Sequence, residues 1–262
     1  MIRLAASDID GTIKPYGGEI SDRTKDAVRR WIASGRVYAL SSGRSLPAAL
    51  EIARELGMAE GYVIYAGGGA VADIDGRVLR EWTMPPDAAR RVYEIARFHP
   101  VRVNAFVPGA VLSAHAGYYP NTGTESVLDD APFDEGRIAA PYKMEIYTSD
   151  PALRLRLLDE YRRAGFDVTW AAEVNLEIMM PGTGKGAALD WLGGRLGIPR
   201  EERCAFGDNT NDLSLLDACG LSFAMGNAAE PLKRAARIVC GSDRDDGEAL
   251  ALEAIMNGEI SL

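Results

Sequence analysis

The sequence predicts an α/β protein in which a mostly parallel sheet is interrupted by an inserted α+β domain. In the first third of the chain, short apolar runs alternate with helical patterns, an order typical of parallel sheets. In the middle, strand-like segments follow one another before the alternation resumes. Polar residues directly follow three of the apolar runs, which indicates a site at the carboxyl ends of sheet strands.

Apolar runs indicate the buried strands, and Ser, Pro and Gly at their flanks indicate where helices begin and end. In the first third we expect strands at Ile2–Ala6, Val37–Ser41 and Tyr62–Tyr65, helices at Asp22–Ser34 and from Ser45 to Gly57, and a hairpin of Ala70–Ile74 and Arg77–Trp82 around Asp75-Gly76.

The middle of the chain begins at Pro85-Pro86 and mixes strands with helices. We expect helices at Asp87–Phe98 and Pro151–Ala164, strands at Val101–Val107, Val111–Ala114, Lys143–Tyr147, Asp167–Ala171 and Asn175–Met180, and a loop at Gly117–Pro141. Short strands and helices then alternate again at Cys204–Phe206, Leu213–Cys219, Leu221–Ala224 and Arg237–Val239.

This organisation predicts a core built from both ends of the chain. Residues 1–82 and 182–262 form the core, and residues 83–181 form the inserted domain. An insertion of about 100 residues is large enough to hold a hydrophobic core of its own.

Composition excludes several classes of function. The 262 residues carry a formal charge of −9, which argues against a nucleic-acid partner because phosphate backbones require a basic face. No stretch approaches the roughly 20 apolar residues of a membrane helix. The three cysteines are widely spaced, and the N-terminus lacks the pattern of a secretory signal, so we expect a cytoplasmic protein with reduced thiols.

The most informative segment is Asp8-Ile9-Asp10-Gly11-Thr12, which follows the first strand. Residues two apart on a strand point the same way, so both carboxylates are expected to face one small volume. Two anions so near to each other repel unless a cation or a shared proton offsets the repulsion. Mg²⁺, which prefers oxygen ligands, is the natural partner, and a carboxylate here can also act as a covalent nucleophile.

Three further elements carry polar chemistry: Ser41-Ser42-Gly43-Arg44 after the second strand, Lys185 at the start of a helix, and Gly207-Asp208-Asn209-Thr210-Asn211-Asp212 after a later strand. Strand ends of one parallel sheet share a crevice. Carboxylates for a metal, a hydroxyl and a cation are what phosphoryl transfer requires.

In this order, the four elements resemble the four motifs of the haloacid dehalogenase (HAD) superfamily. The insertion between the second and third motifs resembles a C2 cap on a Rossmann-like core. The segments Leu176-Glu177-Ile178 and Ala224-Met225-Gly226-Asn227-Ala228 are similar to the Cof-type branch.

The resemblance implies a role for each matching residue. Asp8 is the nucleophile that forms an aspartyl phosphate, and Asp10 protonates the leaving oxygen and then activates water. The residues implied in binding the substrate phosphate are Gly11, Thr12, Ser42, Gly43, Arg44, Lys185 and Asn211. Those implied at the metal are Asp8, Asp10 (through its backbone carbonyl), Asp208 and Asp212. Of these, Asp212 is expected to contact the metal ligands rather than the metal itself.

The sequence differs from the Cof-type pattern at one point, directly after the third strand. The chain reads Gly68-Gly69-Ala70 where Asn-Gly-Ala is usual, so a side-chain amide is missing. The glycine run permits an unusual backbone path there.

The expected function is Mg²⁺-dependent hydrolysis of a small soluble phosphate ester, such as a sugar phosphate or a phosphoglycolate-like ester. A phosphomutase on the same core is the alternative, and a haloacid dehalogenase is less favoured because it needs neither Asp10 nor the acids near Asp208. A P-loop hydrolase is disfavoured because Gly186 follows Lys185 where a hydroxyl is needed. A non-enzymatic binding module is disfavoured because all four motifs are intact. The sequence leaves the oligomeric state open.

Overall fold

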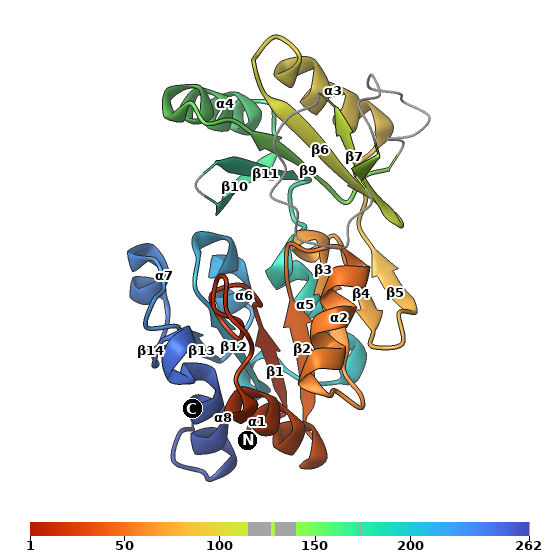
Figure 1. Ribbon diagram of the computed structural model, residues 1–262. Helices are drawn as coiled ribbons and strands as arrows, with labels where there is room; N and C mark the ends of the chain where they lie inside the picture. The colour runs from red at the N-terminus through yellow and green to blue at the C-terminus, as the bar shows by residue number, and fades with distance from the viewer. Residues whose placement is uncertain (115–126, 129–139, 173, 262) are drawn as a thin grey trace. The chain divides into compact units, whose positions relative to one another are not determined.

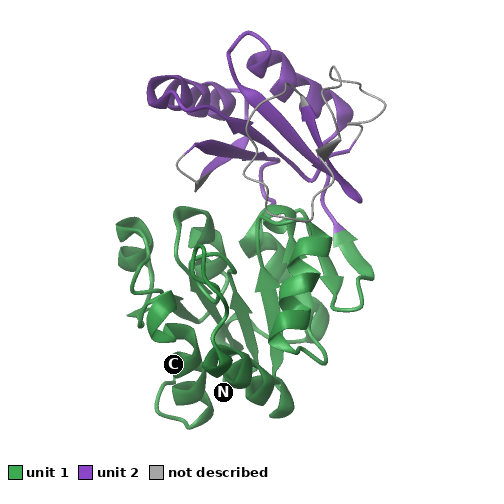
Figure 2. Cartoon of the chain, viewed as in Figure 1, with its two compact units in different colours: residues 1–80, 184–262 green, residues 81–183 purple. Residues whose placement is uncertain are grey.

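The protein is described by a computed structural model that covers residues 1–114, 127–128, 140–172 and 174–261. The chain divides into two compact units (Figure 2). Unit 1 comprises residues 1–80 and 184–262, and unit 2 comprises residues 81–183.

Unit 1 is built on a sheet with the strand order β14-β13-β12-β1-β2-β3-β4-β5 (Figure 1). Neighbouring strands from β14 to β3 are parallel, and β4 runs antiparallel to β3. The strands are β1 Leu4–Ser7, β2 Val37–Ser41, β3 Tyr62–Tyr65, β4 Ala70–Asp73, β5 Val78–Glu81, β12 Arg203–Gly207, β13 Leu221–Ala224 and β14 Ile238–Val239.

The central strands β1 and β12 are buried at every position. A parallel strand covered by helices on both faces reads as a continuous apolar run, and this is why Leu4-Ala5-Ala6 shows no alternation. The polar residues after these strands therefore emerge from the best-packed part of the unit.

Helices cover this sheet. They are α1 Asp22–Ala33, α2 Leu46–Leu56, α5 Lys185–Leu196, α6 Leu213–Asp217, α7 Glu230–Ala235 and α8 Gly247–Met256, with short 3₁₀ turns η1 Ala66–Gly68, η2 Arg200–Glu202, η3 Thr210–Asp212 and η4 Asp243–Asp245. Helix α1 packs against α2 and α8, and α5 packs against α6.

Local chemistry explains where the first helices begin and end. The Ser21 hydroxyl accepts a 3.0 Å hydrogen bond from the backbone N–H of Thr24, which satisfies one of the free donors at the start of α1. Gly57 ends α2 in the left-handed conformation, which glycine adopts without steric cost.

Unit 2 pairs a second sheet with two helices. The strand order is β10-β11-β9-β6-β7-β8, antiparallel except for the β7–β8 pair. Its elements are α3 Pro86–Ala96, β6 Arg102–Val107, β7 Ala110–Ala114, β8 Val127–Leu128, β9 Lys143–Tyr147, α4 Pro151–Arg163, β10 Asp167–Ala172 and β11 Asn175–Met179.

The sheet of unit 2 has one apolar and one polar face. Val103, Met144 and Ile178 belong to a buried cluster that includes side chains of α3 and α4. The alternate positions carry Asn104 and Glu145, which are paired across β6 and β9 and are also buried. The period-2 alternation of strands thus separates an apolar core from a row of polar side chains.

The predicted fold class, α/β with a parallel-sheet core, is confirmed. Helices α7 and α8 were not predicted, because α8 is apolar on most sides and shows no amphipathic period. The predicted loop Gly117–Pro141 lies mostly outside the described residues, and within it the structure places the short strand β8. Among the helices that the structure describes, none has the length and apolar character needed to cross a membrane.

Candidate active site

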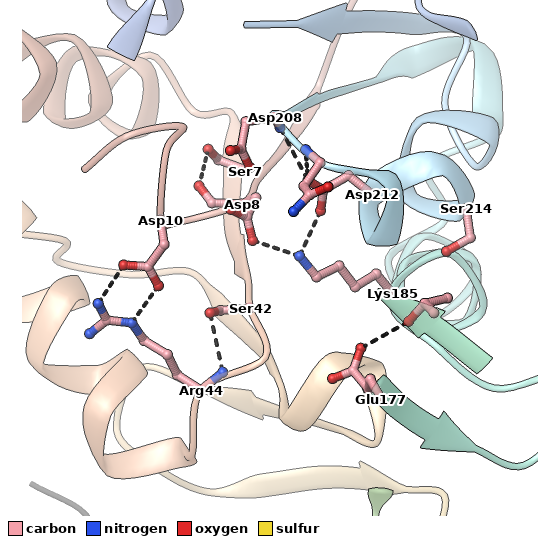
Figure 3. Close-up of polar contacts among 12 residues, drawn as sticks. Ser7, Asp8, Asp10, Ser42, Arg44, Glu177, Lys185, Asp208, Asp212 and Ser214 are labelled. Atoms are coloured by element: carbon pink, nitrogen blue, oxygen red, sulfur yellow. Dashed lines mark hydrogen bonds and ion pairs between the residues drawn. The ribbon is translucent and has the colours of Figure 1, made fainter. Parts of the chain in front are cut away.

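The site forms around Asp8, one residue beyond the end of β1 (Figure 3). Its backbone N–H donates to the carbonyl of Phe206 on β12 at 3.1 Å, so the parallel ladder continues up to Asp8. The Asp8 residue is 6% exposed. A carboxylate thus stands at the carboxyl end of a central strand, where open α/β sheets build their sites.

Lys185 joins two of the aspartates. Its Nζ lies 2.6 Å from Oδ1 of Asp8 and 2.6 Å from Oδ1 of Asp212 (Figure 3). Lys185 is the first residue of α5 and is 2% exposed. Burial lowers the pKa of the ammonium, but Asp212 and Asp8 outweigh burial and raise it, so Lys185 is a permanent cation here.

Asp212 is held by backbone donors as well as by the lysine. Its Oδ2 accepts from the N–H groups of Asp208 and Asn209 at 3.1 and 3.2 Å. A Cβ on Gly207 would lie 2.6 Å from Cβ of Asp212, so glycine is required before Asp208 for this turn to close. Asp212 is therefore fully buried and fixed in orientation.

Asp8, Asp208 and Asp212 form an acidic cluster whose possible ligand atoms all lie within 4.8 Å of one another. Burial, with the charges of Asp212 and Asp208, raises the pKa of Asp8 well above its usual value. Burial and then Asp212 raise the pKa of Asp208 to about 7. One lysine does not offset three carboxylates this close, and a hard divalent cation with oxygen ligands fits this donor set.

Asp10 faces a different partner. The Arg44 guanidinium donates to it through two bonds, Nε to Oδ2 at 2.8 Å and Nη2 to Oδ1 at 2.7 Å. Asp10 is not part of the acidic cluster of Asp8, Asp208 and Asp212. The two aspartates of the first motif thus have separate surroundings, one built from a lysine and acids and the other from an arginine.

The turn after β2 supplies a buried hydroxyl. Ser42 is 2% exposed, its N–H donates to the carbonyl of Ile64, and its Oγ accepts from the N–H of Arg44 at 3.2 Å. Gly43 lies in the same turn between Ser42 and Arg44. The Ser42 hydroxyl keeps its own proton available to donate to an anion.

The turn after Asp10 requires glycine. Gly11 has φ +82°, and a Cβ there would lie 2.3 Å from Oδ2 of Asp208. The Gly11 carbonyl accepts from the Asn227 side chain at 2.8 Å. The hydroxyl of Thr12 is buried without a hydrogen-bond partner, as is Oδ1 of Asn211, so both have unused capacity for a bound group.

Gly68 brings the β3–β4 connection against the start of α5. Its φ is +95°, and a Cβ there would lie 2.0 Å from the backbone carbon of Gly184, the residue before Lys185. No asparagine side chain fits at this contact. The missing amide is therefore replaced by close backbone packing beside Lys185.

The structure thus brings Asp8, Lys185, Asp208 and Asp212 together and pairs Asp10 with Arg44. Sequence reasoning missed Asn227, although it lies in a segment singled out for its resemblance. It also missed Tyr16, whose ring lies beside Gly11. No motif distinguished Tyr16, because a lone tyrosine in a loop gives no periodic signal.

The mostly parallel sheet of unit 1 ends in a buried aspartate, a lysine and further carboxylates, a set of groups suited to phosphoryl transfer. Residues 5–252 match the family described as haloacid dehalogenase-like hydrolase. This match spans nearly the whole sequence, so the chain belongs to that family, and the resemblance noted from the motifs is confirmed.

Curated relatives and solved structures agree with this assignment. The chain is 27% identical over 252 residues to a 5-amino-6-(5-phospho-D-ribitylamino)uracil phosphatase of Bacillus subtilis, covering 96% of this chain and 94% of that protein. It is 29% identical over 255 residues to an HMP-PP phosphatase of Serratia proteamaculans, covering 89% and 87%. The structure of a haloacid dehalogenase-like hydrolase from Bacteroides thetaiotaomicron matches with a TM-score of 0.82 at 26% identity, covering 97% and 100% of the two chains. The predicted enzyme class, a HAD-type phosphatase, is confirmed.

Proposed function

We propose that the protein is a Mg²⁺-dependent phosphomonoester hydrolase that acts on a small soluble phosphate ester through an aspartyl phosphate on Asp8. The observation that carries the proposal is the placement of Asp8 at the end of β1, against Lys185 and beside Asp208 and Asp212. A buried carboxylate next to a fixed cation is suited to attack on an anionic phosphoryl group.

In the first step, a carboxylate oxygen of Asp8 forms a bond to phosphorus as the ester P–O bond breaks. The leaving oxygen takes a proton from Asp10. Both Asp10 oxygens accept from Arg44 in the structure, so to donate this proton Asp10 first picks one up and turns away from Arg44.

In the second step, water attacks phosphorus, Asp10 accepts the proton of that water, and Asp8 is released as a carboxylate. Lys185 and the Ser42 hydroxyl bind the phosphoryl oxygens. The backbone N–H groups of Gly11 and Thr12 donate to the carbonyls of Lys14 and Ile9, at 2.8 and 3.3 Å, so they would have to leave these turn contacts to reach the anion. The Thr12 hydroxyl, which is buried without a partner, can donate to the same anion. For Asn211 the donor would be the side-chain NH₂ group, since its unpartnered Oδ1 only accepts.

Asp8 and Asp208, with the backbone carbonyl of Asp10, are the residues that would hold Mg²⁺. Asp212, whose oxygens accept from Lys185 and from two backbone N–H groups, would lie beside these ligands and complete the acidic cluster. When bound, the ion offsets the negative charge of the carboxylates and of the substrate. Residues 83–181 are proposed as the C2-type cap, inserted into a core of residues 1–82 and 182–262. A cytoplasmic location is part of the proposal and is supported by the three free cysteines.

Small phosphate esters are the proposed substrate class. The relatives named above are phosphatases of a ribityl phosphate and of HMP-PP, and the protein's net charge of −9 argues against a nucleic-acid substrate. A sugar phosphate or a phosphoglycolate-like ester remains the proposal, with a phosphomutase on the same core as the second candidate.

The test is phosphate release from a panel of sugar phosphates, phosphoglycolate and nucleoside monophosphates, with Mg²⁺ and with EDTA. Wild type is compared with Asp8→Asn and with Asp217→Asn, which changes an exposed aspartate of α6 in the same way. We expect release that needs Mg²⁺, is lost in Asp8→Asn and is kept in Asp217→Asn. Full activity of Asp8→Asn would overturn the proposal, and isomerisation of a sugar phosphate without net release would favour the mutase.

A further inference from the structure

A buried carboxyl group touches the residue that precedes the candidate nucleophile. Glu248, in the first turn of α8, is 1% exposed. Its Oε2 lies 2.6 Å from the Ser7 hydroxyl, and its Oε1 lies 2.6 Å from the Tyr38 hydroxyl. No salt bridge involves Glu248 within the part of the chain that the structure describes. A buried charge without a cation is costly, which favours a neutral acid.

The number of protons shared by Glu248, Ser7 and Tyr38 also favours a neutral Glu248. The Ser7 hydroxyl has one proton, yet it lies within hydrogen-bond distance of two acceptors, Oε2 of Glu248 and the backbone carbonyl of Asp8 at 2.8 Å. If Glu248 is ionised, one of these contacts has no proton. If Glu248 is a neutral acid, its O–H donates to Ser7, Ser7 donates to Asp8, and Tyr38 donates to Oε1, so every contact holds one proton.

We propose that Glu248 is a positioning residue for the nucleophile: as a neutral carboxylic acid it donates to Ser7, and Ser7 donates to the Asp8 carbonyl, which fixes the end of β1. This inference rests on the proposed role of Asp8. It assigns to α8 a part in catalysis that none of the four motifs includes.

The backbone around Glu248 is shaped to bring it into the core. A Cβ on Gly247 would lie 2.0 Å from the carbonyl oxygen of Gly241, so only glycine lets α8 begin this close to the preceding loop. Asp246, just before it, has φ +55°, a conformation that costs free energy for a non-glycine residue. Strain and close packing at the start of α8 are consistent with a side chain whose position matters.

Among the described residues, no charged side chain shifts the pKa of Glu248, although η4, which carries Asp243, Arg244 and Asp245, also contacts α8. Burial raises its pKa to about 7, and the hydrogen bonds from Ser7 and Tyr38 offset only part of that effect. The titratable groups that face it are Tyr38 on β2, Cys204 on β12 and Cys240 after β14, and burial raises the pKa of each, so all are neutral near pH 7. Helix α1, which packs on α8, buries Thr24, Ala27, Val28, Trp31 and Ile32, none of them ionisable.

The variants that test the proposal are Glu248→Gln, Glu248→Met and Ser7→Ala, with Glu51→Gln on the exposed face of α2 as the matched control. The amide of Glu248→Gln still donates to Ser7 and accepts from Tyr38, but it does not ionise. Glu248→Met and Ser7→Ala each break the chain of hydrogen bonds from Glu248 through Ser7 to the Asp8 carbonyl. The assay is phosphate release from p-nitrophenyl phosphate with Mg²⁺ between pH 5.5 and 9, with folding checked by thermal unfolding.

We expect Glu248→Met and Ser7→Ala to lower kcat by about 10- to 100-fold, the effect of a small misplacement of a reacting group, with little change in KM. Glu248→Gln should keep the wild-type kcat at pH 6 and lose the fall in kcat that ionisation of Glu248 causes above pH 7. A wild-type kcat in Glu248→Met, or an unchanged alkaline fall in Glu248→Gln, would overturn the proposal.

A second measurement does not depend on turnover. Infrared difference spectra of wild type against Glu248→Gln at pH 6 should show the C=O stretch of one buried neutral carboxylic acid, and Ser7→Ala should shift that band because the hydrogen bond from the acid is lost. Absence of the band would reject the neutral acid even if the enzyme is active. If the band shifts in Ser7→Ala but wild type releases no phosphate, the hydrogen bond from Glu248 to Ser7 is supported and the proposed hydrolase is rejected.

Discussion

Arg44 restrains Asp10 in a way that bears directly on catalysis. Its planar guanidinium occupies both carboxylate oxygens, at 2.8 and 2.7 Å. Because both oxygens of Asp10 accept from Arg44, Asp10 has to leave this pair before it gives or takes a proton. We infer that Arg44 holds Asp10 in place in the free enzyme and that binding of the substrate anion, which also attracts Arg44, frees Asp10 for proton transfer.

This inference predicts coupling between the two residues. Arg44→Lys keeps the charge but loses the two-donor fork, and loss of one charge-assisted bond of about 1.5 kcal/mol should lower kcat about tenfold. Arg44→Met should lower it further, but should add little when Asp10→Asn is already present. Steady-state kinetics of the single and double variants measure this, with Arg54→Met on α2 as the control. Fully additive losses would contradict the coupling.

At the scale of elements, the 3₁₀ turn η1 and the start of α5 act as one support for Lys185. Gly68 contacts the Gly184 backbone so closely that a Cβ would lie 2.0 Å from its carbonyl carbon. Helix α5 in turn contacts β3 and β4. The position of the site lysine is therefore set by backbone packing from an element that carries no charged side chain.

Gly68→Ala should disturb this support. The methyl group has no room, so we expect overpacking of about 1–3 kcal/mol in the free energy of unfolding and a clear loss of kcat as Lys185 shifts. Gly17→Ala is the matched control, because Gly17 also has a positive φ, +69°, but has open space around it. Urea unfolding and phosphate release distinguish the two variants. Equal effects would mean that backbone strain alone, rather than the contact with Gly184, accounts for the loss.

Lys143, in the sheet of unit 2, is a second buried lysine that binds two carboxylates, as Lys185 does in unit 1. Its Nζ lies 2.7 Å from Glu145, also bonds Glu177, and sits 4.2 Å from the centre of the Phe106 ring. Burial lowers its pKa, but the two glutamates outweigh burial and raise it. All three charged groups are buried, so the lysine holds together two carboxylates that would otherwise repel each other.

Lys143→Met should destabilise unit 2 by about 3–5 kcal/mol, since it leaves buried carboxylates without their cation. Hydrogen exchange of the full chain provides the measurement, with the amides of β6 and β9 expected to lose protection and those of β1 and β12 to keep it. Lys233→Met, which breaks a surface pair with Glu230, should change neither. Unchanged protection in β9 would show that the three charges do not stabilise the sheet.

At the scale of the whole molecule, topology brings together residues far apart in the chain. Asp8 and Lys185 are 177 positions apart, and Ser7 and Glu248 are 241 apart. The parallel sheet and its strand-end residues were predictable, because apolar runs followed by Asp or Ser carry a local signal. The pairing of Arg44 with Asp10 was not, because a long side chain reaches any of several acids. Glu248 gave no signal, since the two acids of the apolar helix α8, Glu248 and Glu253, show no amphipathic period.

The acidic cluster makes the stability of unit 1 depend on a cation. Asp8, Asp208 and Asp212 lie within reach of one another with one lysine between them, and burial and Asp212 raise the pKa of Asp208 to about 7. Without a metal, ionised Asp208 is unfavourable in the folded state above that pH. We therefore expect Asp208→Asn to be at least as stable as wild type in EDTA at pH 8, although it removes a carboxylate that the proposed metal site uses.

Mg²⁺ should make wild type more stable than Asp208→Asn. An ion that binds only the folded state, present at 100 times its Kd, adds about 2.7 kcal/mol to the free energy of unfolding. Wild type and Asp217→Asn should gain this in Mg²⁺ relative to Na⁺ of equal ionic strength, and Asp208→Asn should gain little. Urea unfolding at pH 8 measures all three proteins in both salts. An equal gain in Asp208→Asn would place the ion elsewhere, and an equal gain in Na⁺ would reduce the effect to screening of the net charge of −9.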